Sequence, residues 1–422
     1  MLKVRDIQGS AGTQSVTMGS DNFSAVNLAD YHISEDYGFI LENPKDTLPE
    51  YYEPWMKIAQ ILPLLIETKK LREEVQQMPE LGLQHLTGYR EQRLARVILS
   101  HLVMGYIWQE GEQGAVKMLP RSIAIPYHQL SQVLGLPSIM VHADFVLANW
   151  KRKDPLGPMT IENLSTIVSL PGGDSLQGFV LVTLLVEVAA IPGVKAVIQA
   201  VKAMINEERQ NLLQALRDMA LSINQMSEAL RLMYDYVDSD VFYNTIRIFL
   251  SGWKNNPSMP DGLIYEGAAE EPLPFSGVSA AQSSVFHVYD ELFGIQHQPE
   301  SADFLLKMRQ YMPPAHQDFI ERIKKVPNLA GYIQRSEDPD LLAAFNQCIT
   351  ALTELRSLHI RIVSKFVTAA GARARTNQLV KEKEVIKVQE RGTGGSPAMV
   401  FLKSVRDTCK EGLLKSNTAE NS

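Results

Sequence analysis

The residues with the clearest potential for chemistry lie in one run of the chain, residues 352–366. Its apolar side chains recur every three or four positions, which predicts an amphipathic helix. His359 falls on the apolar face of that helix, and Arg356 lies one turn earlier on nearly the same face. The helix would therefore present an imidazole and a guanidinium side by side.

Two interpretations of His359 fit this spacing. A single histidine on an apolar face is ordinarily a core residue whose hydrogen bonds are satisfied. Alternatively, the imidazole is an axial haem ligand and Arg356 pairs with a haem propionate. Imidazole binds haem iron, and a guanidinium fork fits a carboxylate. The spacing alone does not choose between them.

The rest of the sequence supports the second interpretation. From about Tyr31 to about Leu414 the chain resembles the indoleamine 2,3-dioxygenase family, and within it the second, low-affinity vertebrate paralogue more than the first. Besides the run described above, the segments that carry the resemblance are Phe242–Lys254, Asp261–Gly267, Ser279–Ser284 and Arg391–Gly395. The resemblance implies an enzyme that uses haem to insert dioxygen into the indole ring of L-tryptophan or related indoleamines. The product would be N-formylkynurenine, at the first step of the kynurenine pathway.

The same resemblance implies a set of residues around one haem b. These residues are His359, Arg356, Ser279, Ala280, Phe286 and Asp290. His359 would be the proximal iron ligand and Arg356 the partner of a propionate. Small side chains at Ser279 and Ala280 would let the backbone approach a flat cofactor. Asp290 would support the proximal side, with a surface carboxylate as the alternative.

A second set is implied for the substrate and the reaction. Its members are Phe242, Tyr243, Arg247, Thr183, His142, Phe145, Val146, Phe179 and Thr393. Arg247 should meet the substrate carboxylate, which a guanidinium binds in bidentate fashion. On a helix Arg247 shares a face with Tyr243. Taken without the resemblance, these positions also fit a core Phe, a half-buried Tyr and a surface Arg.

Three positions depart from the tighter-binding paralogue. Val278 stands where the family usually has glycine, Thr183 replaces a serine, and His142 replaces a tyrosine. We expect these changes to alter the volume and polarity of the pocket and to weaken its hold on tryptophan. His142 either hydrogen-bonds bound dioxygen or only lines the wall.

The composition fits a soluble globular protein. Of 422 residues, 21% are charged, 45% are hydrophobic, and the net charge is −7, which argues against nucleic acid or an anionic membrane as partner. Two cysteines are too few for a disulfide framework and suit a reducing compartment. The apolar run Phe179–Ile191 is short and contains Glu187, so it predicts a buried core helix. We expect a cytoplasmic monomer that needs an electron donor to keep the iron ferrous.

The predicted fold is mainly α, in two domains. Residues 1–28 predict a disordered tail, 29–170 a small domain, and 171–422 a large helical haem-binding domain with a mobile loop at 371–395. The segment 119–127 contains too many prolines to predict a long helix. The longer helices are expected at 177–191, 194–227, 240–251, 284–294, 341–370 and 398–414.

A signalling protein is the alternative function. Tyr127 and Tyr234 each stand in a short pattern of an apolar residue, a spacer, Tyr, two residues, then Leu or Val. Phosphorylation would add charge that an arginine-containing partner could bind. We expect Tyr127, which follows a proline, to be accessible, and Tyr234 to be buried in a helix.

Overall fold

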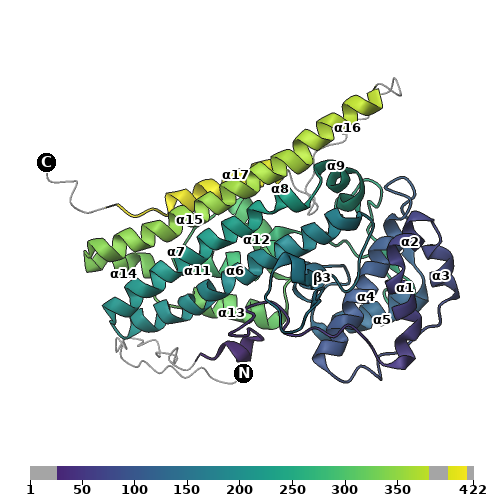
Figure 1. Cartoon of the computed structure of the whole chain (residues 1–422), viewed down its shortest axis with the longest axis horizontal. Coiled ribbons are helices and arrows are strands. Elements are labelled where there is room, and N and C mark those ends of the chain that lie inside the picture. The colour runs from purple at the N-terminus through teal and green to yellow at the C-terminus, as the bar shows by residue number, and fades with distance from the viewer. Residues whose placement is uncertain (1–25, 380–397, 416–422) are drawn as a thin grey trace, which may run out of the picture.

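The computed structural model describes residues 26–379 and 398–415, and these form a mainly helical fold, as predicted (Figure 1). Short helices gather at one end of the molecule, and longer helices run roughly alongside one another through the rest. Within the described ranges the strands form two pairs, and each strand is two residues long.

The helices from η3 to α5 pack at that end of the molecule. They are η3 (Glu50–Tyr52), α1 (Glu53–Gln60), α2 (Leu62–Glu67), α3 (Leu71–Gln77), α4 (Tyr89–Trp108) and α5 (Arg121–Leu134). The preceding helix, η2 (Leu28–Tyr31), packs against α13 (Pro314–Lys324) instead (Figure 1). The expectation that prolines would prevent a long helix at 119–127 was wrong. α5 runs for 14 residues with Pro126 inside it, because its buried face packs on α4 and offsets the lost hydrogen bond.

Three long helices form the centre of the fold. α6 (Gly173–Ile205) packs along α7 (Arg209–Arg231), and α7 packs along α15 (Pro339–Val363). The predicted break before residue 194 was wrong, because α6 continues through Pro192 between buried neighbours. The chain turns instead at Glu207, whose φ of 56° is left-handed. The sequence has no Gly or Pro at that turn that would predict it.

The remaining elements surround these helices. They are β1 (Met118–Leu119), η4 (Ala143–Leu147), β2 (Lys151–Arg152), η5 (Ile161–Asn163), β3 (Leu164–Ser165), α8 (Met233–Tyr236), α9 (Ser239–Val241), η6 (Phe242–Ile246), α10 (Arg247–Phe249), β4 (Ile264–Tyr265), η7 (Ala280–Gln282), α11 (Ser284–Phe293), α12 (Pro299–Arg309), α13 (Pro314–Lys324), α14 (Leu329–Ser336), η8 (Ser364–Ala369), α16 (Ala370–Leu379) and α17 (Ala398–Glu411). β1 pairs in parallel with β4, and β2 pairs antiparallel with β3.

The buried apolar side chains form one continuous cluster that runs from Leu28 to Cys409. α6 is long and apolar enough to cross a membrane, but most of its apolar window is buried against other helices, so it is a core helix. The domain boundary near residue 170 stays a prediction. Of the predicted loop 371–395, residues 371–379 continue α16, and the others lie outside the described residues.

Candidate functional site

A cavity of about 300 Å³ lies among the long helices, and its wall is mainly apolar. It brings together most of the residues that the sequence predicted for the site. Those that line it are His142, Phe145, Val146, Phe179, Thr183, Phe242, Arg247, Ser279, Ala280, Phe286, Asp290, Arg356 and His359. Val278 lines it as well, Tyr243 lies behind the lining, and Thr393 is outside the described residues.

Irregular helical turns shape this wall. Within the described ranges, π-helical turns occur at η4, η6 and η8, and each of them supplies lining side chains. A π-helical turn inserts an extra residue and so re-aims the side chains beside it, which is why such turns are frequent at functional sites. The side chains supplied are Phe145, Val146, Phe242, Phe366 and Val367.

A buried ion pair fixes the first of these turns. Arg96 Nε lies 2.9 Å from Asp144 Oδ1, and both side chains are fully buried. Arg96 also donates to the Ser131 hydroxyl at 2.6 Å and to the Pro137 carbonyl at 2.8 Å. Asp144 in turn accepts from the backbone N–H of Val141 at 3.1 Å. The segment that carries His142 to Val146 is therefore anchored to α4 and α5.

His359 lies on α15 and presents a half-buried ring to the cavity. Burial lowers the pKa of its imidazole to about 4, so the ring is neutral at pH 7 and keeps a free lone pair. Among the described residues, no group hydrogen-bonds either ring nitrogen. His101 shows the contrast, because its buried ring lies 2.7 Å from the Val97 carbonyl. A hydrogen-bonded core histidine therefore does not fit the arrangement of His359.

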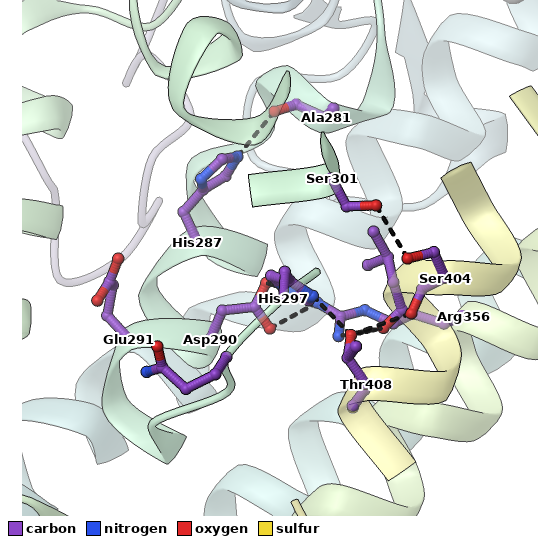
Figure 2. A network of polar contacts seen from close by, with 12 residues as sticks. Ala281, His287, Asp290, Glu291, His297, Ser301, Arg356, Ser404 and Thr408 are labelled. Atoms are coloured by element: carbon purple, nitrogen blue, oxygen red, sulfur yellow. Dashed lines mark hydrogen bonds and ion pairs between the residues drawn. The ribbon is translucent and has the colours of Figure 1, made fainter. Parts of the chain in front are cut away.

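Arg356, one turn before His359, is already paired. Its Nη2 lies 2.6 and 2.8 Å from the two carboxylate oxygens of Asp290 (Figure 2). Burial alone would raise the pKa of Asp290, but Arg356 and His297 outweigh it and lower that pKa to about 2. Asp290 is 6% exposed, so the alternative of a surface carboxylate was wrong. Any further carboxylate at Arg356 would have to share it with Asp290.

His297 was not predicted as a site residue. In the structure its side chain is 6% exposed and its Nε2 lies 2.9 Å from Asp290 Oδ2. Its Nδ1 lies 2.7 Å from the Thr408 hydroxyl on α17 (Figure 2). A stretch rich in Gln, Pro and Glu gives no signal of this, because the contacts come from α11 and α17.

Arg247 and Tyr243 meet as the helical spacing predicts. The Arg247 guanidinium lies 5.2 Å from the centre of the Tyr243 ring, a cation–π distance. The Tyr243 ring packs against the backbone of α16, where a Cβ added at Gly371 would lie 2.8 Å from its hydroxyl. Arg247 reaches the cavity wall while Tyr243 supports it from behind.

Aromatic rings form a continuous apolar wall around the rest of the cavity. The Phe179 ring lies 6.1 Å from Phe145 and 5.0 Å from Phe242, and Phe242 lies 5.9 Å from Phe366. Such separations are typical of favourable aromatic pairs. Rings that support one another are held in place, so the wall can receive a flat apolar ligand without rearranging.

His142 lies in the polar part of this wall, and its ring is paired with another side chain. Its Nε2 lies 2.9 Å from Glu187 Oε1, which also accepts from the Ser283 hydroxyl at 2.6 Å. Glu187 comes from α6 and was noticed in the sequence only as an obstacle to membrane insertion. Its spacing of four and eight residues from Thr183 and Phe179 could have placed it on the cavity face. The Thr183 hydroxyl donates to the Phe179 carbonyl at 2.7 Å.

These residues fit a haem. The cavity offers a neutral imidazole that no residue of 26–379 or 398–415 hydrogen-bonds, small side chains at 279–281, a cation at Arg356 and a mainly apolar wall. No cluster of three or more His, Cys, Asp or Glu side chains suited to a metal ion occurs in residues 26–379 or 398–415. A neutral imidazole whose ring nitrogens have no hydrogen-bond partner among the described residues, set in an apolar wall, suits an iron that brings its own macrocycle.

The two tyrosines of the alternative function reverse their expected exposure. Tyr127 is fully buried, with the Arg96 guanidinium 5.3 Å from its ring centre. Tyr234 is 37% exposed, and the Lys365 ammonium lies 4.7 Å from its ring centre. Both expectations of accessibility were wrong. A kinase could not reach Tyr127 unless α5 left α4.

Comparison with known proteins gives a consistent result. The family model described as Indoleamine 2,3-dioxygenase matches residues 27–412. Indoleamine 2,3-dioxygenase 2 of Homo sapiens is 53% identical over 392 residues, which cover 92% of this chain and 96% of that protein. Indoleamine 2,3-dioxygenase 1 of Rattus norvegicus is 44% identical over 390 residues, which cover 92% and 96%. A protein of Haliotis madaka named myoglobin is 36% identical over 385 residues, which cover 90% and 97%. Because this match runs along nearly the whole chain, the protein belongs to the indoleamine 2,3-dioxygenase family.

Proposed function

We propose that this protein is a haem-dependent dioxygenase that opens the indole 2,3-bond of L-tryptophan and related indoleamines to give N-formylkynurenine. One observation carries the proposal: the imidazole of His359 lies neutral in the wall of an apolar cavity, with no hydrogen-bond partner among the described residues. Membership of the dioxygenase family supplies the reaction class. Dioxygen is the co-substrate.

The haem-binding residues each have a defined role in this proposal. Bound haem b would supply the ferrous iron at which dioxygen is held and activated. His359 would be its proximal ligand, and Arg356 would meet a propionate while Asp290 holds the guanidinium in place. Ser279 and Ala280 would leave room at the edge of the macrocycle, and Phe286 would pack against its face.

The remaining lining residues would bind and orient the substrate. The indole would lie against Phe145, Phe179 and Phe242, and its carboxylate would meet Arg247. Tyr243 would restrict the rotation of Arg247 through the contact of their side chains. Fixing the carboxylate and the ring together positions the 2,3-bond for reaction and excludes water. Val146, Thr183 and His142 would complete the wall, and Thr393 would contact the amino-acid group of the substrate.

We infer that tryptophan binds weakly. His142 and Glu187 place a polar pair in the wall, and Val278 adds bulk to it. The protein would act as a cytoplasmic monomer with an electron donor that keeps the iron ferrous. Its domain boundary would lie near residue 170, and the segment 371–395 would close over the cavity.

A relative named myoglobin makes oxygen storage the second candidate. Oxygen storage would need His359 and the apolar cavity, but it would not need a cation that binds a substrate carboxylate. Arg247 at the wall therefore favours the dioxygenase. Signalling through phosphotyrosine has less support than either of these functions, because Tyr127 is fully buried.

The test combines a spectrum with product analysis. Purified protein reconstituted with haem should show a Soret band and, with a reducing system and L-tryptophan, should form N-formylkynurenine. A Soret band with reversible oxygen binding but no product would favour storage. Absence of haem binding would contradict both.

A further inference from the structure

The buried group formed by Asp290, Arg356, His297 and Thr408 has a property that the proposed function does not require. It joins α11, α15, α17 and the loop after α11 beneath the cavity (Figure 2). The Asp290 carboxylate accepts from Arg356 on one side and from His297 on the other. Only Arg356 and Asp290 reach the cavity wall, so His297 acts on a ligand through them.

The hydrogen bonds of His297 can be satisfied with either one or two ring protons. Its Nε2 must donate, because the Asp290 carboxylate can only accept. Thr408 carries one hydroxyl hydrogen and has three neighbours, namely His297 Nδ1 at 2.7 Å, the Ser404 carbonyl at 3.0 Å and the Val405 carbonyl at 3.2 Å.

If the Thr408 hydroxyl donates to His297 Nδ1, the imidazole is neutral. If it turns to donate to the Ser404 carbonyl, it accepts from Nδ1–H and the ring is an imidazolium. Rotation of one hydroxyl therefore separates the two charge states, and neither leaves a ring nitrogen unsatisfied. Histidine is the side chain whose charge ordinarily changes near neutral pH.

A carboxylate arriving at Arg356 would change the charge balance of this group. With a neutral His297, one cation would then face two carboxylates. With an imidazolium, two cations would face two carboxylates, and the ring already lies 2.9 Å from the Asp290 oxygen. Buried charges that are not balanced are costly, so the second arrangement is favoured.

We propose that His297 is a positioning residue for the contact between Arg356 and a haem propionate, and that it takes up a proton when the propionate shares Arg356 with Asp290. This inference rests on the proposed function. The proton would keep Asp290 in place beside Arg356 and so keep the guanidinium oriented toward the cavity.

The other titratable groups around His297 do not change charge between pH 6 and 8. Asp290 on α11 has its pKa lowered to about 2 against the effect of burial, by Arg356 and His297. Burial lowers the pKa of His287, also on α11, to about 4. On α17, burial raises the pKa of the Cys409 thiol, which stays neutral. On α15, Arg356 keeps its charge: burial lowers the guanidinium pKa, but the charges and hydrogen bonds of Asp290 and Cys409 together outweigh burial and raise it.

Linkage gives the sign of the effect. A proton taken up on binding makes haem affinity rise as pH falls. Loss of haemin should therefore become faster as pH rises, by up to about tenfold per pH unit for one linked proton. The rate of haemin transfer to excess apomyoglobin measures this directly, because it depends on loss from the donor.

The experiment compares three variants with the parent between pH 6 and 8. His297→Gln can still donate to Asp290 but cannot take the second proton, so its rate should be nearly independent of pH. Thr408→Val removes the acceptor for His297 Nδ1–H and should make the rate of haemin loss depend less steeply on pH. Ser404→Ala is the matched control on α17, since it removes the hydroxyl that bonds Ser301 at 2.9 Å but keeps its own carbonyl. The rate of haemin loss from Ser404→Ala should depend on pH as steeply as that of the parent.

The outcomes separate cleanly. All four proteins share the same iron ligand, so titration of a ligand on the iron affects them equally. A flat profile in the parent, or an unchanged slope in His297→Gln, would overturn the inference. A parent protein that binds no haemin at any pH would overturn the proposed function, and this inference with it. Circular dichroism of each variant before haem is added confirms that the fold is intact.

Discussion

Glu187 accepts a hydrogen bond from His142 across the wall of the cavity, with Oε1 and Nε2 2.9 Å apart and both side chains 4% exposed. The contact joins α6 to the segment before η4, which are separated by 45 residues in the sequence. His142 Nε2 is therefore committed to a protein partner. A direct hydrogen bond from this nitrogen to bound dioxygen would first require the pair to separate.

Removing Glu187 should therefore destabilise the fold through His142. In Glu187→Leu the buried Nε2 donor loses its partner, which costs about 1–3 kcal/mol. In the double variant with His142→Phe the imidazole donor is gone and only the Ser283 hydroxyl has lost its acceptor, so part of that cost should be recovered. Urea unfolding of the two single variants and the double variant measures the coupling. Strictly additive effects would contradict an energetic link between these residues.

Haem retention should depend on His359. His359→Ala removes the only imidazole in the described part of α15 and leaves a small apolar gap at the cavity wall. The variant should lose most of its Soret absorbance, while its far-ultraviolet circular dichroism matches the parent. Because the ring has no hydrogen-bond partner among the described residues, the loss of stability should be small. A full Soret band with an unchanged axial spectrum would exclude His359 as the ligand.

Arg247 should distinguish tryptophan from indoles without a carboxylate. Arg247→Leu keeps an apolar side chain against Tyr243 but removes a charge-assisted contact worth about 1.5–3 kcal/mol. Tryptophan affinity should fall by roughly 10- to 150-fold, whereas indole itself should bind almost as before. Spectral titration of both ligands measures this. Equal losses for the two ligands would exclude a carboxylate contact.

Acid should destabilise the protein through its buried histidines. Burial lowers the pKa of His101, His287 and His359 to about 4 and that of His316 to about 3, from an ordinary value of 6.5. The unfolded chain therefore binds more protons than the folded one below pH 6.5. This contribution to stability is fully present above pH 6.5 and is lost as pH falls toward 4, by about 1.4 kcal/mol per pH unit for each histidine.

Urea unfolding of the haem-free protein at pH 7, 6 and 5 gives the number of protons taken up on unfolding. His101→Gln should reduce this uptake by about one proton at pH 5. A free energy of unfolding that stays constant from pH 7 to pH 5 would show that these rings are not held neutral by the fold.

Local patterns predicted the helices that have clear ends. The expected 284–294 and 398–414 helices correspond to Ser284–Phe293 and Ala398–Glu411. Where burial opposes local preference, the patterns failed. α6 continues through Pro192 because its flanks are buried, and α5 contains Pro126 for the same reason. The turn at Glu207 has no sequence signal.

The site was predicted where side chains lie on the face of one helix, and missed where they meet across helices. Arg356 and His359, or Tyr243 and Arg247, share a face through spacing that can be read directly. Glu187 gains its role only from His142 and Ser283, which other segments supply. His297 likewise depends on α17. The exposure of Tyr127 was wrongly predicted because packing of α5 on α4 is not a local property.

The protein should bind tryptophan weakly. Thr183 and Val278 line the cavity, and His142 completes a polar pair in its wall. If these side chains weaken the binding of the substrate and of the transition state equally, KM rises with little change in kcat. We expect a KM at or above the upper end of the usual range of about 1 μM to 1 mM. The variant His142→Tyr, Thr183→Ser, Val278→Gly should lower KM.

Steady-state kinetics at matched haem content tests this, and the three single variants show how the effect divides. The sites share one cavity, so their effects need not add. His142→Tyr also deprives Glu187 of its imidazole partner, so its unfolding should be measured alongside. Val278→Gly keeps the backbone N–H that donates to the Leu250 carbonyl at 3.0 Å, so this backbone contact should persist. A low micromolar KM in the parent would contradict the prediction, as would a triple variant that binds tryptophan no more tightly.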